Sequence, residues 1–316
     1  MPDIAFFEVF QEEAAVLKRF LPKTLCATFS EKTIQAANPK KVPAGLISIR
    51  TQSVIPAAWE KDLQGVLTRS SGYDHLSRLA RRIPCGYLPN YCVRAVAEQA
   101  ILLALALMRR LPLQMKQMAA FQRSGMTGRE LLNKKLFVLG VGRIGSEVVT
   151  LARGMGMHVR GADLVPRSKD LDYVSLAAGL NWAEMVICCL PLTQATQGML
   201  NKKAFPSGAQ GIVLVNVGRG EVTPLADMKK LLDSGVLAGL GLDVYEDEPV
   251  LAETLRQKNA TRLSKLIFEL KARDNVIFTP HNAFNTQEAV ERKVKESIAA
   301  VNYFLAKKTF PDLVAP

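Results

Sequence analysis

Histidine is scarce in this chain, with only three among 316 residues. The five cysteines are odd in number and include no C-x-x-C pair, which argues against a zinc site or a disulfide framework and predicts free thiols in a reducing cytoplasm. Apolar runs are short, the longest being residues 101–108, far below the roughly 20 residues that cross a bilayer. The N-terminal segment lacks a basic leader. We therefore expect a soluble cytoplasmic protein with no metal site and no membrane partner.

Acidic residues are under-represented, because the chain has 29 Asp and Glu but 41 Lys and Arg. The formal net charge is therefore +12. The basic residues are dispersed and form no long tract of the kind that binds nucleic acid. We therefore expect a solvated surface with a mild attraction for anions rather than a nucleic-acid partner. A hydrophobic content of 48% with 22% charged residues is typical of a globular protein with sizeable cores.

Short apolar runs alternate with helix-compatible stretches along the whole chain. A first series of strand candidates comprises Ile4–Val9, Leu25–Phe29, Leu46–Ile49 and Val66–Thr68. A second series comprises Lys135–Leu139, Val159–Ala162, Met185–Leu190, Ile212–Asn216, Ala238–Leu242 and Val276–Thr279. Continuous apolar runs of this length are typical of parallel strands buried on both faces. The alternation predicts an α/β protein with right-handed crossovers.

A long apolar helix is predicted from Arg94 to about Met118, between the two series. The change near residue 95 indicates two α/β units joined by this helix. A final helix is predicted from Thr286 to about Ala306, and it can cross back to the first unit.

Residues 136–149 read LFVLGVGRIGSEVV, a strand followed by G-x-G-x-x-G and an apolar helix start. Gly140 can make the tight turn, Gly142 lets the backbone approach a pyrophosphate, and Gly145 allows close helix packing. The backbone from Arg143 and Ile144 onward then offers N–H groups and a positive helix end to the phosphates. Although a lone motif also occurs in ordinary turns, this context predicts a dinucleotide site.

The next strand ends at Asp163, 18 residues beyond Gly145. A carboxylate there accepts hydrogen bonds from ribose hydroxyls and repels a 2′-phosphate, which favours NAD over NADP. Arg160 and Arg167 flank this position and weaken the exclusion.

Three later strands end in residues capable of chemistry. Arg219 lies between two glycines in VNVGRG, Glu248 follows Asp243 in LDVYEDEP, and His281 lies in FTPHNAF. Taken singly, each has an ordinary structural interpretation: a surface charge, a loop carboxylate, a hydrogen-bonded core imidazole. Because ligands bind beyond the carboxyl ends of parallel strands, we expect all of them at the edge that holds the pyrophosphate loop.

A guanidinium, a carboxylate and an imidazole are the groups needed to reduce a 2-keto acid. Arginine binds the substrate carboxylate with its planar fork. Histidine exchanges a proton with the carbonyl or hydroxyl oxygen, and glutamate stabilises the imidazolium.

The chain resembles the D-isomer-specific 2-hydroxyacid dehydrogenase family, and most closely its D-lactate dehydrogenase branch. The resemblance is carried by TRSSGYDHL (68–76), LPNYCVRAVAEQAILLALALMR (88–109), LPLTQATQGML (190–200) and the three stretches around Arg219, Glu248 and His281. It implies an α/β fold of two Rossmann-like domains with parallel sheets, the NAD domain being inserted into a discontinuous substrate domain. The implied boundaries are 1–95 plus 287–316 for the substrate domain and 96–286 for the NAD domain.

The resemblance also implies a role for individual residues. The catalytic residues are Arg219, Glu248 and His281. Substrate-binding residues are Ser71, Gly72, Tyr91 and Phe284. Cofactor-side residues are Gly140, Gly142, Arg143, Ile144, Gly145, Asp163, Pro191, Thr196, Val217 and Asp243.

The implied function is NAD-dependent interconversion of a small (R)-2-hydroxy acid and its 2-keto acid, with His281 as the acid/base. Two alternatives stay open: a phosphite-type anion dehydrogenase on the same fold, and an NAD-sensing protein that resembles a transcriptional corepressor. The phosphite alternative is weakened because Arg69 is the nearest basic residue in a loop where such relatives carry lysine. A homodimer formed through the region 94–118 is also expected.

Overall fold

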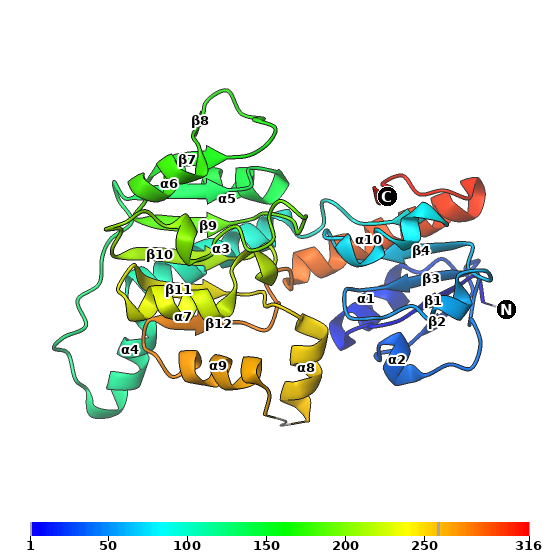
Figure 1. The fold of residues 1–316 in the computed structure, drawn as a ribbon. Helices are drawn as coiled ribbons and strands as arrows, with labels where there is room; N and C mark the ends of the chain where they lie inside the picture. Colours follow the sequence, from blue (N-terminus) through cyan, green and yellow to red (C-terminus); the bar gives the residue numbers. More distant parts are fainter. Residues whose placement is uncertain (1, 258–259, 316) are drawn as a thin grey trace. The chain divides into compact units, whose positions relative to one another are not determined.

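The computed structural model describes residues 2–257 and 260–315, and the chain divides into two compact units. The first unit comprises Met1–Cys92 and Asn285–Pro316, and the second comprises Val93–Phe284. Each unit has its own sheet of parallel strands with helices against it (Figure 1). The predicted α/β class with two Rossmann-like parallel sheets is confirmed.

Unit 1 contains a five-stranded sheet in the order β2-β1-β3-β4-β5. Its strands are β1 (Ile4–Phe6), β2 (Ala27–Phe29), β3 (Leu46–Ile49), β4 (Gly65–Thr68) and β5 (Cys85–Gly86). All four pairings are parallel, so the chain leaves every strand at the same edge of the sheet. The two-residue strand β5 was not predicted, because Cys-Gly carries too little β-type pattern to be recognised.

Two helices of unit 1 pack together although they lie at opposite ends of the chain. They are α1 (Gln11–Phe20) and α10 (Gln287–Lys307). The Thr286 hydroxyl caps α10 by accepting the Ala289 N–H, which confirms the predicted final helix. A Cβ on Gly65 would lie 2.4 Å from the Phe304 ring, so glycine at the start of β4 allows α10 to approach. The remaining helical segments of this unit are α2 (Ile34–Ala37), η1 (Ala57–Trp59), η2 (Asp74–Leu76) and η3 (Leu79–Arg81).

Unit 2 contains a seven-stranded sheet in the order β12-β11-β10-β9-β6-β7-β8. Its strands are β6 (Lys135–Leu139), β7 (His158–Ala162), β8 (Asp172–Tyr173), β9 (Met185–Cys188), β10 (Ile212–Asn216), β11 (Leu237–Leu242) and β12 (Val276–Phe278). Six of these correspond to predicted runs, and the short edge strand β8 was missed. The order reverses beside β6, so the loop after β6 lies at the topological switch point where dinucleotides bind.

Helices cover both faces of the unit 2 sheet. One face is covered by α3 (Val93–Met108) and α5 (Arg143–Gly154). The opposite face packs in a single apolar core against α6 (Leu176–Trp182), α7 (Leu225–Asp233), α8 (Glu248–Arg256) and α9 (Arg262–Lys271). Other helical segments are α4 (Leu111–Gln117), η4 (Met118–Ala120), η5 (Lys202–Ala204) and η6 (Gly220–Val222). Among residues 2–257 and 260–315, no helix is long and apolar enough to span a membrane.

The prediction of one helix from Arg94 to about Met118 is wrong, because the helix is interrupted after Met108. Arg110 adopts a left-handed conformation with φ of 53°, and Pro112 stands in the first turn of α4. Proline has no N–H to donate to the Met108 carbonyl, which a continuous helix would require. That carbonyl instead accepts a hydrogen bond from the Arg129 N–H at 2.8 Å.

Candidate active site

In unit 2, the loops that follow the neighbouring strands β6, β9, β10 and β11 each pack against the loop of the next strand in the sheet. A Cβ on Gly140 would lie 3.0 Å from the Cys189 carbonyl, and one on Gly218 would lie 2.4 Å from the Leu190 oxygen. One on Gly220 would lie 1.9 Å from the backbone of Tyr245. Side chains at these glycines would separate the loops. The glycines therefore allow the loops to pack closely at the carboxyl edge of the sheet, where the predicted residues lie.

His281 and Glu248 meet at this edge, as the resemblance implied. His281 Nδ1 lies 2.6 Å from Glu248 Oε2, and both side chains are partly buried. Glu248 opens α8, and its second oxygen accepts the Tyr245 N–H at 3.1 Å. Because both carboxylate oxygens have partners, Glu248 is fixed in orientation and presents one oxygen to the imidazole.

The His281 backbone has a φ of 50°, a left-handed value that is uncommon for a residue other than glycine. Asp243 holds the loop in this conformation. Its Oδ1 accepts from the Thr279 hydroxyl at 2.5 Å and the Asn282 N–H at 2.9 Å, and its Oδ2 accepts from the Ala283 N–H at 2.9 Å. Backbone strain of this kind persists only where surrounding contacts determine it.

Asp243 itself is fully buried, and burial raises its pKa while the hydrogen bonds from Thr279, Asn282 and Ala283 oppose the rise. The structure thus engages both of its oxygens in supporting the histidine loop. Its predicted contact with the cofactor stays a prediction.

Arg219 lies in the loop after β10, between Gly218 and Gly220, and is half-buried. Its Nη1 donates to the Gly218 carbonyl at 2.8 Å. The loop is shaped by Asn216, the last residue of the strand, whose Nδ2 donates to the Arg219 carbonyl and whose Oδ1 accepts the Gly218 N–H. This geometry turns the chain back immediately after the strand.

Tyr245 and Asn216 are structural members of the site that sequence reasoning missed. The Tyr245 hydroxyl donates to the carbonyls of Leu242 and Thr279, at 3.1 and 2.9 Å, and so joins the loops after β11 and β12. Both residues stand inside the quoted motifs VNVGRG and LDVYEDEP. Their position at strand ends, like that of the catalytic candidates, is the signal that could have found them.

The glycine-rich loop has the geometry that a dinucleotide needs. Gly140 has a φ of +82°, and a Cβ on Gly145 would lie 1.9 Å from the Gly140 oxygen, so neither position tolerates a side chain. Gly142, the N-cap of α5, provides no side-chain cap, and the space beside it is open. The first N–H groups of α5, from Arg143 onward, are therefore left for an external anion.

Asp163 directly follows β7 and is half-buried, with its Oδ1 accepting the Val165 N–H at 3.0 Å. The neighbouring Arg160 is engaged elsewhere, because its Nε lies 2.8 Å from Asp172 Oδ2 and its guanidinium stacks on the Trp182 ring. Because the charge of Arg160 is paired with Asp172, Arg160 attracts a 2′-phosphate less than the sequence suggested. These residues fit NAD.

The remaining cofactor-side candidates lie on adjoining loops. Pro191 is exposed, whereas Val217 is buried at the end of β10. Thr196 is buried too, and its hydroxyl bonds within its own loop, to the Pro191 carbonyl at 2.7 Å and the Thr193 N–H at 2.8 Å. The structure gives Thr196 a part in shaping this loop, and its contact with the cofactor stays a prediction.

The substrate-side candidates are divided between the units. In unit 1, Ser71 and Gly72 follow β4 in a loop held by hydroxyls: Ser70 Oγ donates to the Gly72 carbonyl at 2.7 Å, and Cys92 Sγ donates to Ser71 Oγ at 3.6 Å. Tyr91 is only 2% exposed, and burial raises its pKa. In unit 2, the Phe284 ring stands edge-on to the His281 ring, with 6.3 Å between their centroids.

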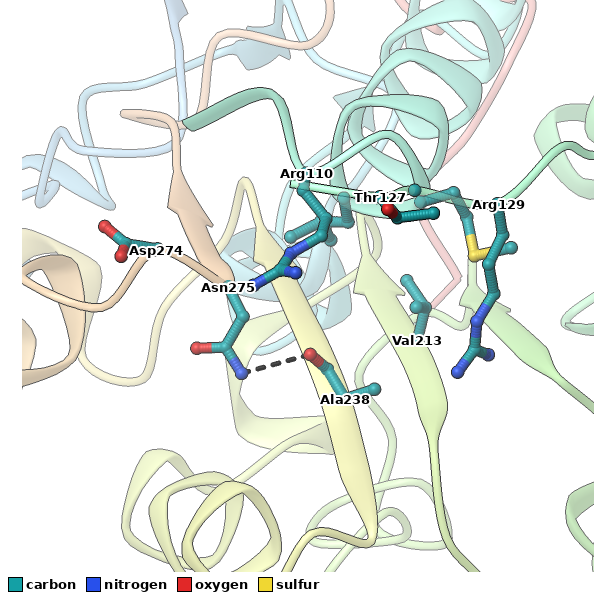
Figure 2. Close-up of a pocket in the computed structure, with 10 residues that line it drawn as sticks. Arg110, Thr127, Arg129, Val213, Ala238, Asp274 and Asn275 are labelled. Atoms are coloured by element: carbon teal, nitrogen blue, oxygen red, sulfur yellow. Dashed lines mark hydrogen bonds between the residues drawn. The ribbon is translucent and has the colours of Figure 1, made fainter. Parts of the chain in front are cut away.

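A cavity of about 500 Å³ also lies in unit 2, but at the amino-terminal edge of its sheet. Val213, Ala238 and Asn275 line it from the starts of β10, β11 and β12, with Arg110 and Arg129 above them (Figure 2). None of the predicted site residues is among the described residues that line it. Because dinucleotides bind at the carboxyl edge of such sheets, this cavity is not the candidate active site.

Comparisons with known proteins bear on the family of this chain. Residues 101–283 match the family model of the D-isomer specific 2-hydroxyacid dehydrogenase, NAD binding domain. A D-lactate dehydrogenase of Lactiplantibacillus plantarum is 31% identical over 265 residues, which cover 81% of this chain and 79% of that protein. An aromatic 2-oxoacid reductase of Clostridium sporogenes is 30% identical over 251 residues, covering 77% and 76%.

Among solved structures, D-lactate dehydrogenase from Aquifex aeolicus, complexed with NAD and lactic acid, matches with a TM-score of 0.86 and 29% identity over 99% of both chains. The family model spans more than half of this chain and includes the glycine-rich loop and the loops of Arg219, Glu248 and His281. NAD is therefore the cofactor that this fold binds. The chain belongs to the D-isomer-specific 2-hydroxyacid dehydrogenase family.

Proposed function

We propose that this chain is an NAD-dependent oxidoreductase that interconverts a small (R)-2-hydroxy acid and its 2-keto acid. The observation that carries the proposal is the His281 Nδ1 to Glu248 Oε2 contact of 2.6 Å, at the sheet edge that holds the glycine-rich loop. An imidazole backed by a carboxylate is the arrangement of a general acid/base. NAD, when bound, supplies the hydride-transfer chemistry.

His281 acts as the proton-transfer residue. Glu248 engages Nδ1, so the tautomer is set and Nε2 is the nitrogen that exchanges a proton with the substrate oxygen. In keto-acid reduction, Nε2–H gives its proton to the carbonyl oxygen, and the neutral ring is left hydrogen-bonded to Glu248. In the reverse direction, Nε2 accepts the hydroxyl proton, and the Glu248 carboxylate stabilises the imidazolium.

We propose that Arg219 binds the substrate carboxylate; for Ser71 and Gly72, substrate binding stays what the resemblance implies. A guanidinium can bind both carboxylate oxygens in its plane, which orients the keto carbon as well as attracting the charge. Phe284, which packs edge-on against His281, is proposed to line the side of the substrate.

The experiment is NADH oxidation against a panel of 2-keto acids, from glyoxylate and pyruvate to branched, aromatic and dicarboxylic ones. We expect turnover with at least one of them and an (R)-configured product, identified by chiral chromatography. Tight NADH binding without turnover of any keto acid would refute the proposal and favour the NAD-sensing alternative. Turnover of phosphite alone would favour the other alternative.

We also infer that the enzyme is a homodimer formed through the region around α4. Apolar side chains are exposed there, notably Met115, Met118 and Phe121 at 70, 65 and 72%. An apolar patch of this kind on a soluble protein marks an interaction surface. Light scattering should give about twice the chain mass of 34.7 kDa, and Met115→Glu with Phe121→Glu should give the single-chain mass. A monomeric wild type would refute this inference.

A cytoplasmic location is inferred from the thiols. All five cysteines are free, and burial raises the pKa of Cys188 to about 12, so this thiol stays protonated and unreactive. Free thiols in this number suit a reducing compartment. Cell fractionation against a periplasmic or organellar marker tests the assignment.

A further inference from the structure

Polar side chains gather at the carboxyl edge of the unit 1 sheet, around the loop that follows β4. Thr68 ends β4, Ser70 follows it closely, and His75 lies in η2. Thr68 and Ser70 are buried, with exposures of 0 and 8%, and His75 is half-buried. Buried polar side chains need hydrogen-bond partners. These three find partners in one another and in the backbone of the loop that contains Ser71 and Gly72.

Three contacts link His75 to this loop. His75 Nε2 lies 3.1 Å from Thr68 Oγ1. Thr68 Oγ1 lies 2.6 Å from Ser70 Oγ. Ser70 Oγ donates to the Gly72 carbonyl at 2.7 Å. We term this series of contacts, from His75 through Thr68 and Ser70 to Gly72, the hydroxyl chain.

The hydroxyl chain has a single direction, which follows from counting protons. A carbonyl only accepts, so the one hydroxyl proton of Ser70 is used on Gly72, and Ser70 Oγ accepts from the Thr68 hydroxyl. The one hydroxyl proton of Thr68 is then used on Ser70, so Thr68 Oγ1 accepts from His75 Nε2. His75 therefore carries a proton on Nε2 and is the donor at which the chain begins.

The far end of the hydroxyl chain fixes the backbone of the loop. The Gly72 carbonyl shares a peptide group with the Tyr73 N–H, and in a trans peptide the two point in opposite directions. The Ser70 carbonyl accepts the Leu88 N–H at 3.1 Å, which fixes the peptide group that carries the Ser71 N–H. The peptide group that carries the Gly72 N–H lies between these two. Both N–H groups are thus oriented before any ligand arrives.

We propose that His75 is a positioning residue that sets the affinity of this loop for the substrate carboxylate. The inference rests on the proposed function and on the substrate-binding role that the resemblance implies for Ser71 and Gly72. Backbone N–H groups bind a carboxylate more tightly when they are oriented beforehand, because freedom that the loop retains must be lost on binding. Hydrogen bonds in a chain also polarise one another, so the donor at the start strengthens the last bond, to Gly72.

The experiment compares His75→Gln with His75→Met, two side chains of similar length that differ in the terminal amide. The glutamine amide can donate to Thr68 Oγ1 in place of Nε2, whereas methionine has no donor. His75→Met should raise KM for the best keto acid by about 3- to 12-fold, as the loss of one net hydrogen bond predicts. The Ki of oxamate, an unreactive analogue of a 2-keto acid, should rise equally, while kcat changes by less than about twofold. His75→Gln should restore KM and Ki to within about twofold of the wild type.

A second variant breaks the hydroxyl chain at its middle. Thr68→Val removes the hydroxyl from a side chain of nearly the same shape and should raise the same KM and Ki. Because both changes act through one chain, the double variant with His75→Met should be no worse than the more damaging single variant, whereas independent effects would multiply. His158→Met is the matched control, since His158 is an exposed histidine at the start of β7 in unit 2, and it should leave KM and Ki unchanged.

The outcomes separate the two proposals. A wild type that turns over no keto acid of the panel would overturn both. Wild-type turnover with an unchanged oxamate Ki in His75→Met would overturn the role of His75 and leave the dehydrogenase assignment intact. An equal rise in His75→Gln and His75→Met, effects that multiply in the double variant, or a loss confined to kcat would do the same. If His75→Met does not fold, Thr68→Val decides, because an unchanged Ki in that variant refutes the hydroxyl chain.

Discussion

Replacing Glu248 with glutamine tests the proposed catalytic pairing of Glu248 and His281 most directly. Glutamine keeps the shape of the side chain and can still accept the Tyr245 N–H through its carbonyl oxygen, as Glu248 Oε1 does at 3.1 Å. Its NH₂ group then takes the position of Oε2, 2.6 Å from His281 Nδ1. An amide donor at that position requires Nδ1 to be an acceptor, so the imidazole must carry its proton on Nε2.

The expected loss follows from this change of partner. A hydrogen bond between charged groups contributes about 1.5–3 kcal/mol, and each 1.36 kcal/mol is tenfold in rate. Loss of the bond alone should therefore lower kcat about 10- to 150-fold. The wrong tautomer adds to this loss in both directions. In hydroxy-acid oxidation, an Nε2 that already carries a proton cannot accept the hydroxyl proton. In keto-acid reduction, donation of that proton from the neutral ring would leave an imidazolate anion that nothing stabilises. We expect kcat to fall at least about a hundredfold, within the usual range of general acid–base catalysis.

The assay is steady-state reduction of the best keto acid from the panel, with NADH affinity measured by fluorescence titration. Asp247→Asn is the matched control: it removes the same charge one residue earlier, from an exposed side chain that makes no capping hydrogen bond. Glu248→Gln should change kcat and its pH profile while NADH affinity stays within about threefold. A loss of less than about fivefold, or an equal loss in Asp247→Asn, would refute the assigned pairing.

Three further outcomes are expected. His281→Ala should lower kcat by about 10²–10⁴ in steady-state assays and leave NADH affinity unchanged; near wild-type turnover would exclude it as the proton-transfer residue. Arg219→Lys should raise KM for the keto acid about tenfold or more, because an ammonium group cannot reproduce a bidentate contact, and an effect on NADH affinity alone would contradict the assignment. Because the attraction of Arg69 and Lys293 outweighs burial and lowers the pKa of Glu13 from 4.5 to about 2, its ionisation contributes about 3 kcal/mol of stability that is present above pH 4.5 and lost as the pH falls toward 2. Urea unfolding at about pH 6 and pH 3 should show that Glu13→Gln removes this dependence, and parallel pH profiles would count against it.

The candidate site could be predicted from the sequence because the residues that follow the strands of a parallel sheet all lie at the same edge. Each strand of unit 2 runs in the same direction, so the residues that follow β6, β10, β11 and β12 must all lie at one edge. The residue types then give the chemistry, and the glycines mark where loops approach closely. The 2.6 Å contact between His281 and Glu248 follows from that order together with the resemblance.

The parts that could not be predicted depend on contacts between distant segments. The interruption after Met108 is stabilised by the Arg129 N–H, which lies well outside the helix, although Pro112 gave a local indication of the break. Strands β5 and β8 have two residues each and owe their conformation to their neighbours in the sheet rather than to their own pattern. The buried ion pair of Glu13 and Lys293 was missed for the same reason, because the two residues are separated by most of the chain.

The buried or partly buried carboxylates of Glu8, Asp243 and Glu248 differ in how their oxygens are used, and this difference separates structural support from the proposed catalysis. Asp243 and Glu8 are buried and accept hydrogen bonds mainly from backbone N–H groups, which fixes the loops after β12 and β3. Glu248 divides its oxygens, one accepting a backbone N–H and the other meeting a titratable ring. A carboxylate whose oxygens all accept hydrogen bonds from one loop holds that loop in place, whereas one that is held on one side and paired with an imidazole on the other can respond to the proton that the ring gains or loses. By this criterion we propose that Glu248 takes part in the chemistry and that Asp243 supports the histidine loop, although both follow the same strand.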